Sequence, residues 1–163
     1  VGKLAVEGYL KVFQQQLPFV TMRMFNVYGP GQDMKNLRQG MVSIYLAQAL
    51  RSGNILVKGS PDRFRDFIYI DDLVESWFRA ATYPSALCQT LNIGTGIRTT
   101  VNELLQIICS QVKGCDYHIK GITLGDQPGI YADNTKLKEI LSMKQFITID
   151  KGLEMFIDCA KGI

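Results

Sequence analysis

Three side chains that can bind parts of a ligand lie at the ends of expected strands or in a loop. Asn26 comes directly after the apolar run 19–25, and its amide can donate to a phosphate oxygen and accept from a hydroxyl. Arg65 stands at the start of a second apolar run, and a planar guanidinium can hold a phosphate through two parallel hydrogen bonds. Asp126 lies in a Gly- and Pro-containing loop, where its carboxylate can accept from a vicinal diol such as that of a ribose. Each of these residues, taken alone, would fit a solvated surface position. Only their order along the chain, taken together, favours a binding site.

The sequence lacks the motifs of a self-sufficient catalytic centre. It has one histidine and no Gly-x-Ser-x-Gly, no Walker loop and no Gly-x-Gly-x-x-Gly after a strand. Hydrolase, kinase and complete dinucleotide-binding interpretations therefore have no support. The run 92–96 resembles half of a phosphate loop, but its third glycine position is not filled, which favours a turn at the end of a strand. The adjacent pair Asp71 and Asp72 is interpreted as a helix start, with Asp71 as the N-cap, rather than as an acid/base pair or a metal site.

Composition narrows the class of protein. The 163 residues are 47% hydrophobic and carry a net charge of +3 without a basic stripe, so we expect one globular unit that binds no nucleic acid. No run approaches the roughly 20 apolar residues needed to span a bilayer, and no membrane partner is expected. The four cysteines form no Cys-x-x-Cys pair, which predicts neither a metal site nor a disulfide framework and favours a cytoplasmic setting.

Hydrophobic periodicity predicts strands alternating with helices, hence an α/β fold with at least part of a parallel sheet. Pro18 should end the first helix, and Thr100 with Glu103 should form a capping box. We expect helices at 4–17, 41–50, 72–83, 101–112, 135–141 and 151–160, and strands at 19–27, 55–58, 64–70, 90–93 and 117–119.

Four segments resemble motifs of the extended short-chain dehydrogenase/reductase family, in particular its UDP-glucose 4-epimerase-like nucleotide-sugar epimerases and dehydratases. Residues 2–7 are similar to the segment at the end of the family's Tyr-x-x-x-Lys signature, and residues 23–30 to its substrate-strand motif. Residues 65–73 and 92–94 resemble two further signatures. The resemblance implies that residues 1–163 are the C-terminal portion of a Rossmann-like NAD(P)-binding fold plus the smaller substrate-binding α/β domain, without the N-terminal cofactor-binding half.

The resemblance also implies roles for single residues. Lys3 would be the signature lysine, which holds the nicotinamide ribose of NAD and lowers the pKa of a catalytic tyrosine. Phe25 would contact the nicotinamide, and Asn26 and Arg65 the diphosphate of a nucleotide-diphosphate sugar. Asp126 would contact the ribose, and the segment 56–58, with Lys58, would line the base.

Two positions depart from the family pattern, and both concern the nucleotide. Thr123 stands where many relatives have an arginine, and Lys58 where many have an aromatic residue. Because of these departures, Lys120 is an alternative phosphate contact. The identity of the nucleotide base stays open.

The implied activity is 4-epimerisation of a nucleotide-linked hexose, because nothing in this chain supplies an acid for eliminating water. A dehydratase, a non-catalytic nucleotide-binding relative and an interaction module acting through the first helix are the alternatives. Apolar stripes on two sides of the first helix, together with the family's pairing of that helix across a two-fold axis, predict a homodimer.

Overall fold

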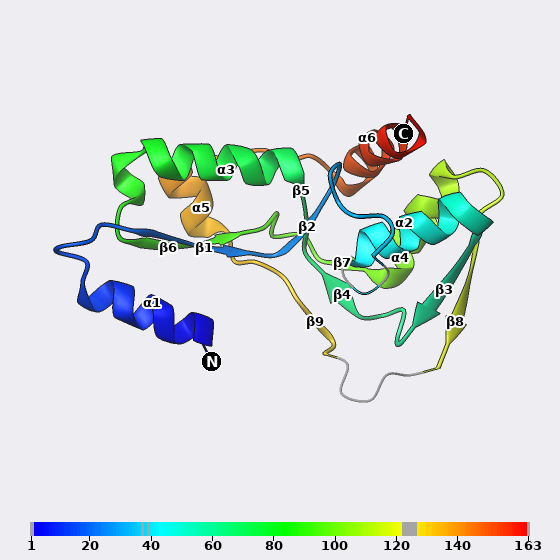
Figure 1. Cartoon of the computed structure of the whole chain (residues 1–163), viewed down its shortest axis with the longest axis horizontal. Helices are drawn as coiled ribbons and strands as arrows, with labels where there is room; N and C mark the ends of the chain where they lie inside the picture. Colours follow the sequence, from blue (N-terminus) through cyan, green and yellow to red (C-terminus); the bar gives the residue numbers. More distant parts are fainter. Residues whose placement is uncertain (1, 37, 39, 122–126, 163) are drawn as a thin grey trace.

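The computed structural model describes residues 2–36, 38, 40–121 and 127–162. The α/β architecture expected from the sequence is confirmed, with strand pairs that are mostly parallel. Two lobes, each with its own apolar core, lie on either side of a set of short strands (Figure 1). Within the described residues, no helix is both long and apolar enough to cross a membrane.

The first lobe, called the β1/β6 lobe, is built on strands β1 (Val20–Met24) and β6 (Gln89–Ile93), which pair in parallel. Helices α3 (Ile70–Thr82) and α5 (Thr135–Leu141) cover one face, and α1 (Gly2–Val12) lies on the other (Figure 1). A 3-10 turn, Pro84–Ala86, precedes β6. The core of this lobe includes Leu91, Ile93, Leu137 and Leu141, all fully buried.

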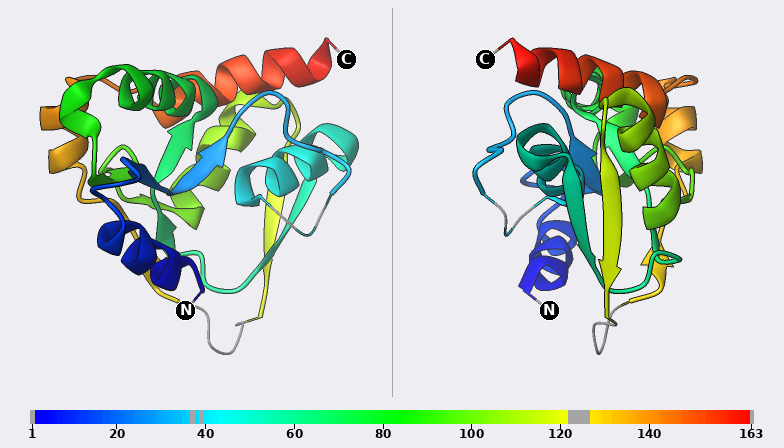
Figure 2. Two further views of the ribbon diagram at one scale, coloured as in Figure 1. Left: turned by 60° about the vertical axis from the view of Figure 1, so that its left-hand side comes forward. Right: turned by 90° about the vertical axis from the view of Figure 1, so that its right-hand side faces the viewer.

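The second lobe, called the β3/β8 lobe, is built on strands β3 (Asn54–Lys58) and β8 (Asp116–Lys120), again parallel. Helix α2 (Met41–Ser52) packs on β3, α4 (Val101–Gln111) packs on α2, and α6 (Ile149–Lys161) packs on α4, so that all three share one core with the ribbon (Figure 2). Ile55 and Val57 point into the core while Asn54, Leu56 and Lys58 are exposed, the alternation expected of a strand with one covered face.

Short strands join the lobes. β2 (Asn26–Tyr28) pairs in parallel with β5 (Phe67–Tyr69), and β4 (Phe64–Arg65) lies between β7 (Thr99–Thr100) and β9 (Gly129–Ile130). Because side chains alternate along a strand, Val27 and Ile68 belong to the core of the β1/β6 lobe, whereas Tyr28 and Tyr69 belong to the other. The same pair of strands therefore contributes to both cores.

The prediction of one long strand at 19–27 and another at 64–70 is wrong in one respect. Each of these segments forms two short strands instead of one. The first breaks at Phe25, whose N–H donates to Ile93, so that β1 and β2 pair with different partners. The second breaks at Asp66, and Ile70 already belongs to α3. An apolar run reveals burial but not the change of partner that interrupts a strand.

Two helix starts and one helix end show where local signals in the sequence suffice and where they do not. The capping box is confirmed: Thr100 Oγ1 accepts from Glu103 N, and the Glu103 carboxylate accepts from Thr100 N at 2.7 Å. The N-cap expected at Asp71 is wrong, since α3 begins at Ile70, two residues earlier than expected, with Tyr69 at the N-cap position and no side-chain cap. The first helix ends at Val12 rather than at residue 17, because the polar run 14–16 offers no apolar face to hold further turns.

Candidate functional site

The buried carboxylate of Asp66 organises the junction between the lobes. Its Oδ1 accepts from Thr95 N at 2.9 Å and from Thr95 Oγ1 at 2.7 Å, and its Oδ2 accepts from Gly96 N at 2.9 Å and Ala132 N at 3.0 Å. Asp66 is fully buried, and these four donors compensate for the loss of water. Gly94 must lack a side chain here, since a Cβ would lie 2.7 Å from Asp66 Oδ2.

Asn26 is held by the same residue. Its backbone N–H and its side-chain Nδ2 both donate to the carbonyl oxygen of Asp66, at 3.0 and 3.1 Å. Asp66 is the neighbour of Arg65, so this pair of bonds brings Asn26 next to Arg65 although 39 positions separate them in the chain. Asn26 also lines the cavity described next.

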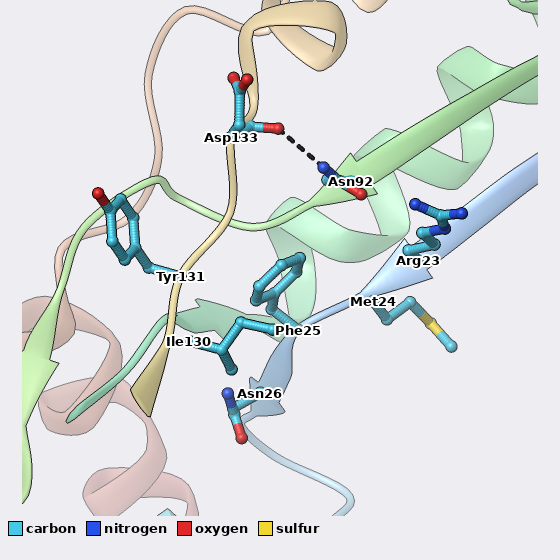
Figure 3. Close-up of a pocket in the computed structure, with 8 residues that line it drawn as sticks. All are labelled: Arg23, Met24, Phe25, Asn26, Asn92, Ile130, Tyr131 and Asp133. Carbon is cyan, nitrogen blue, oxygen red and sulfur yellow. Dashed lines mark hydrogen bonds between the residues drawn. The ribbon is translucent and has the colours of Figure 1, made fainter. Parts of the chain in front are cut away.

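A cavity of about 590 Å³ opens at the carboxyl ends of β1 and β6 (Figure 3). Phe25 and Ile130 face each other in it, and Asn26 lies beside them. The Asn92 side chain closes another part of the wall by donating to Asp133 O at 3.1 Å. Arg23, Met24 and Tyr131 complete the lining. Ligands of open α/β sheets collect at this end of the strands, so the position suits a bound small molecule.

Arg65 lies on β4, beside β9, whose residue Ile130 lines this cavity. Arg65 and Ile130 are register partners in this parallel pairing. Its half-buried guanidinium donates through Nη1 to Phe64 O at 2.7 Å and to Gln127 O at 3.5 Å. Asp126, which is expected to contact the ribose, lies outside the described residues, as does Thr123.

Lys58 lies away from Asn26, at the end of β3, and lines a second pocket of about 440 Å³. Arg63 connects this pocket to the junction by donating to Lys58 O at 2.6 Å and to the Tyr45 hydroxyl at 3.2 Å. Lys120 is the register partner of Lys58 on β8, and both side chains are exposed. Val57, in contrast, is fully buried, so of the segment 56–58 only Leu56 and Lys58 are available to a ligand.

Lys3 lies on α1 and lines a third pocket, of about 530 Å³, between that helix and β1. Arg23 and Met24 line both this pocket and the cavity that holds Phe25, so the two spaces adjoin. The Arg23 guanidinium donates to the Glu7 carboxylate, joining α1 to β1 and lowering the pKa of Glu7.

The structure thus brings Phe25 and Asn26 together in one cavity, places Arg65 on the strand beside cavity-lining Ile130, and keeps Lys3 and Lys58 in separate pockets. Sequence reasoning missed Asp66, which positions Asn26 without facing a ligand. A signal was present, because a charged residue inside an apolar run must find buried partners, and the Gly-Thr-Gly turn after β6 supplies N–H donors.

The first half of the chain matches a known protein family. The model of the NAD-dependent epimerase/dehydratase family covers residues 1–94, which include α1, Asn26 and Arg65. The chain belongs to this family.

Curated relatives agree with this assignment. The chain is 28% identical to a putative UDP-glucose 4-epimerase of Methanocaldococcus jannaschii, a match that covers 99% of this chain and 52% of that protein. It is 30% identical to the UDP-glucose 4-epimerase of Mycolicibacterium smegmatis, over 96% of this chain and 50% of that protein. The chain therefore spans about half the length of these relatives.

A solved structure supports the fold along the same stretch. The UDP-glucose 4-epimerase of Thermotoga maritima, determined with UDP-glucose, superposes with a TM-score of 0.89 at 29% identity. The superposition covers 98% of this chain and 52% of that one.

Proposed function

We propose that this chain is the substrate-binding half of an NAD-dependent 4-epimerase that acts on a nucleotide-diphosphate sugar. The observation that carries the proposal is the double hydrogen bond from Asn26 to Asp66 O, which holds the Asn26 amide in the wall of the 590 Å³ cavity and next to the backbone of the segment that carries Arg65. An amide and a guanidinium from neighbouring segments are suited to a diphosphate.

The pockets on either side fit the two ends of such a ligand. The cavity around Phe25 combines apolar walls with a few polar groups, as expected of a sugar site. The pocket beside Lys58 lies beyond Arg63 and would take the nucleoside. A nucleotide-diphosphate sugar bound in this way would extend from one pocket to the other with its diphosphate at Arg65. Asp126 is proposed to accept from the ribose, as the resemblance implies.

The residues present also fit the nicotinamide end of NAD. Lys3 and Phe25 lie in adjoining pockets and offer, respectively, an ammonium group for a ribose hydroxyl and a flat apolar surface for a ring. Bound NAD would supply the acceptor and donor of hydride for the sugar carbon. This chain would hold and orient the sugar, and Lys3 would keep a positive charge near the base that removes the hydroxyl proton.

The lining of the cavity favours epimerisation over dehydration. Elimination of water needs a group that can donate a proton, and the one carboxyl group among the eight lining residues is that of Asp133. Thr135 donates to it through its hydroxyl and its N–H, and these bonds lower the pKa of Asp133, which keeps it ionised. A dehydratase built on this half would therefore need its acid from elsewhere.

We further propose that the protein forms a homodimer through α1 in the cytoplasm. Leu4, Val6, Tyr9 and Val12 are each more than half exposed on this helix, with Phe13 directly after it. Such a contiguous apolar surface is seldom left in water.

Isothermal titration with UDP-glucose and dTDP-glucose tests the proposed function. Arg65→Ala should weaken binding by roughly 10- to 150-fold, the value of one or two charge-assisted hydrogen bonds. Arg51→Ala, at the far end of α2, is the matched control and should bind as the unaltered chain does. Equal affinities for the two variants would remove Arg65 from the site, and no binding of either sugar nucleotide by the unaltered chain would count against the function.

A further inference from the structure

Two cysteine side chains meet at the edge of the β3/β8 lobe. Cys109 is in the last turns of α4, and Cys115 directly precedes β8. Their sulfur atoms are 2.8 Å apart, and both residues are only partly buried. A disulfide requires a separation of about 2.05 Å, so the sulfurs need to approach by only about 0.75 Å.

The backbone between them explains this proximity. Val112 N donates to Ile108 O, and Cys115 N donates to Val112 O at 3.2 Å, which turns the chain back on the end of α4. Gly114 takes the left-handed conformation (φ +73°) that the turn requires. Asp116 N then donates to Gly53 O and begins the pairing of β8 with β3. The two sulfurs are thus held together by a hydrogen-bonded turn and not by a chance rotamer.

We propose that Cys109 and Cys115 form a modification site: a dithiol that is reversibly oxidised to an intramolecular disulfide by low-molecular-weight disulfides such as glutathione disulfide. The Cys115 thiolate attacks one sulfur of glutathione disulfide, forms a mixed disulfide and expels one glutathione thiolate. The Cys109 thiolate then attacks the Cys115 sulfur and expels the second. Two protein S–H bonds are lost, one S–S bond is made and one is broken, and the two protons end on two glutathione thiols.

The order of the two attacks follows from the surroundings of Cys109. Burial, together with the adjacent Cys115 thiol, raises the pKa of Cys109 to about 12, which makes Cys109 a poor first nucleophile. Once Cys115 is in the mixed disulfide, its sulfur is already beside Cys109, and the second attack is intramolecular. Oxidation would join the end of α4 covalently to the start of β8 and so fix the root of the ribbon that carries Lys58 and Lys120. The proposal does not depend on the proposed function.

Treatment of the fully reduced chain with glutathione disulfide provides the test. We expect the loss of two of the four titratable thiols in a chain that remains a single molecule on a non-reducing gel, with dithiothreitol restoring both. Trypsin cuts after Lys113, between the two cysteines, so peptides 99–113 and 114–120 should appear as one linked species that separates on reduction. The oxidised form should melt roughly 5 °C higher than the reduced form.

Two sets of variants define the controls. Cys88→Ser with Cys159→Ser leaves the pair intact and should still lose two thiols. Cys109→Ala should give a stable glutathione adduct on Cys115, whereas Cys115→Ala should leave Cys109 largely unmodified, because the raised pKa of Cys109 makes it a poor first nucleophile. Four persistent thiols in the unaltered chain would overturn the proposal. So would stable glutathione adducts on both Cys109 and Cys115, or disulfides formed between chains.

Discussion

Asparagine in place of Asp66 should destabilise the protein severely, although the two side chains have almost the same shape. The amide of Asp66→Asn keeps one oxygen, which can still accept from Thr95 N and Thr95 Oγ1. Its NH₂ group replaces the oxygen that accepts from Gly96 N and Ala132 N. Because NH₂ is itself a donor, these two backbone N–H groups would lose their acceptor. At about 1–3 kcal/mol for each unsatisfied buried donor, the loss should be about 4 kcal/mol.

Urea unfolding followed by far-UV circular dichroism measures this free energy, and a melting curve should show a Tm lower by roughly 10 °C. Asp71→Asn is the matched control, because it makes the same chemical change on an exposed residue in the first turn of α3. Its cost should stay below about 1 kcal/mol, the usual contribution of a charge near a helix terminus. If the two variants lost the same stability, the role assigned to the buried Asp66 carboxylate would be refuted.

The remaining predictions concern assembly, capping and the cofactor. Phe13→Asp should reduce self-association measured by light scattering at about 100 μM, and a strictly monomeric unaltered chain would contradict the proposed dimer. Glu103→Ala should cost about 0.5–1 kcal/mol at neutral pH. Hydrogen bonds from Thr100 lower the pKa of Glu103 in the folded protein below its value in the unfolded chain. The stabilisation by Glu103 is therefore complete above the unfolded-state pKa and disappears as the pH falls through the folded-state pKa. Urea titrations at several pH values would detect this loss. The 163-residue chain should bind NAD weakly at best and should epimerise no sugar, because Lys3 is only one part of the proposed catalytic machinery. Turnover of a nucleotide sugar by the purified chain would contradict this prediction.

Local signals in the sequence were sufficient where the interacting groups are close along the chain. The capping box at Thr100 and Glu103 spans three residues, and its geometry follows from residue type and spacing alone. Such a feature involves few competing arrangements, so local chemistry decides it.

Local sequence signals failed to predict helix starts and strand breaks that depend on a residue far away in the chain. Asp72, and not Asp71, makes the specific contact at the start of α3, since its carboxylate accepts from Ile147 N at 2.8 Å, 75 positions away. The breaks in the strands at Phe25 and Asp66 depend in the same way on partners in the segments after β6 and β9. Of the candidate site, residue types and family resemblance named Asn26 and Arg65, but only the fold reveals that Asp66 holds Asn26 next to the segment that carries Arg65.

The arrangement of the lobes limits how the protein can be divided. The chain runs from β1 into β2 and α2, returns with α3 and β6, leaves again with α4 and β8, comes back with α5 and ends in α6 (Figure 1). Neither lobe is a continuous stretch of sequence, so no single cut releases one intact. Recombination between homologous genes at any one point would join parts of two different cores. Such chimaeras should survive only when both parents supply compatible packing on the two sides of β2 and β5, and the two lobes are therefore expected to evolve as one inherited unit.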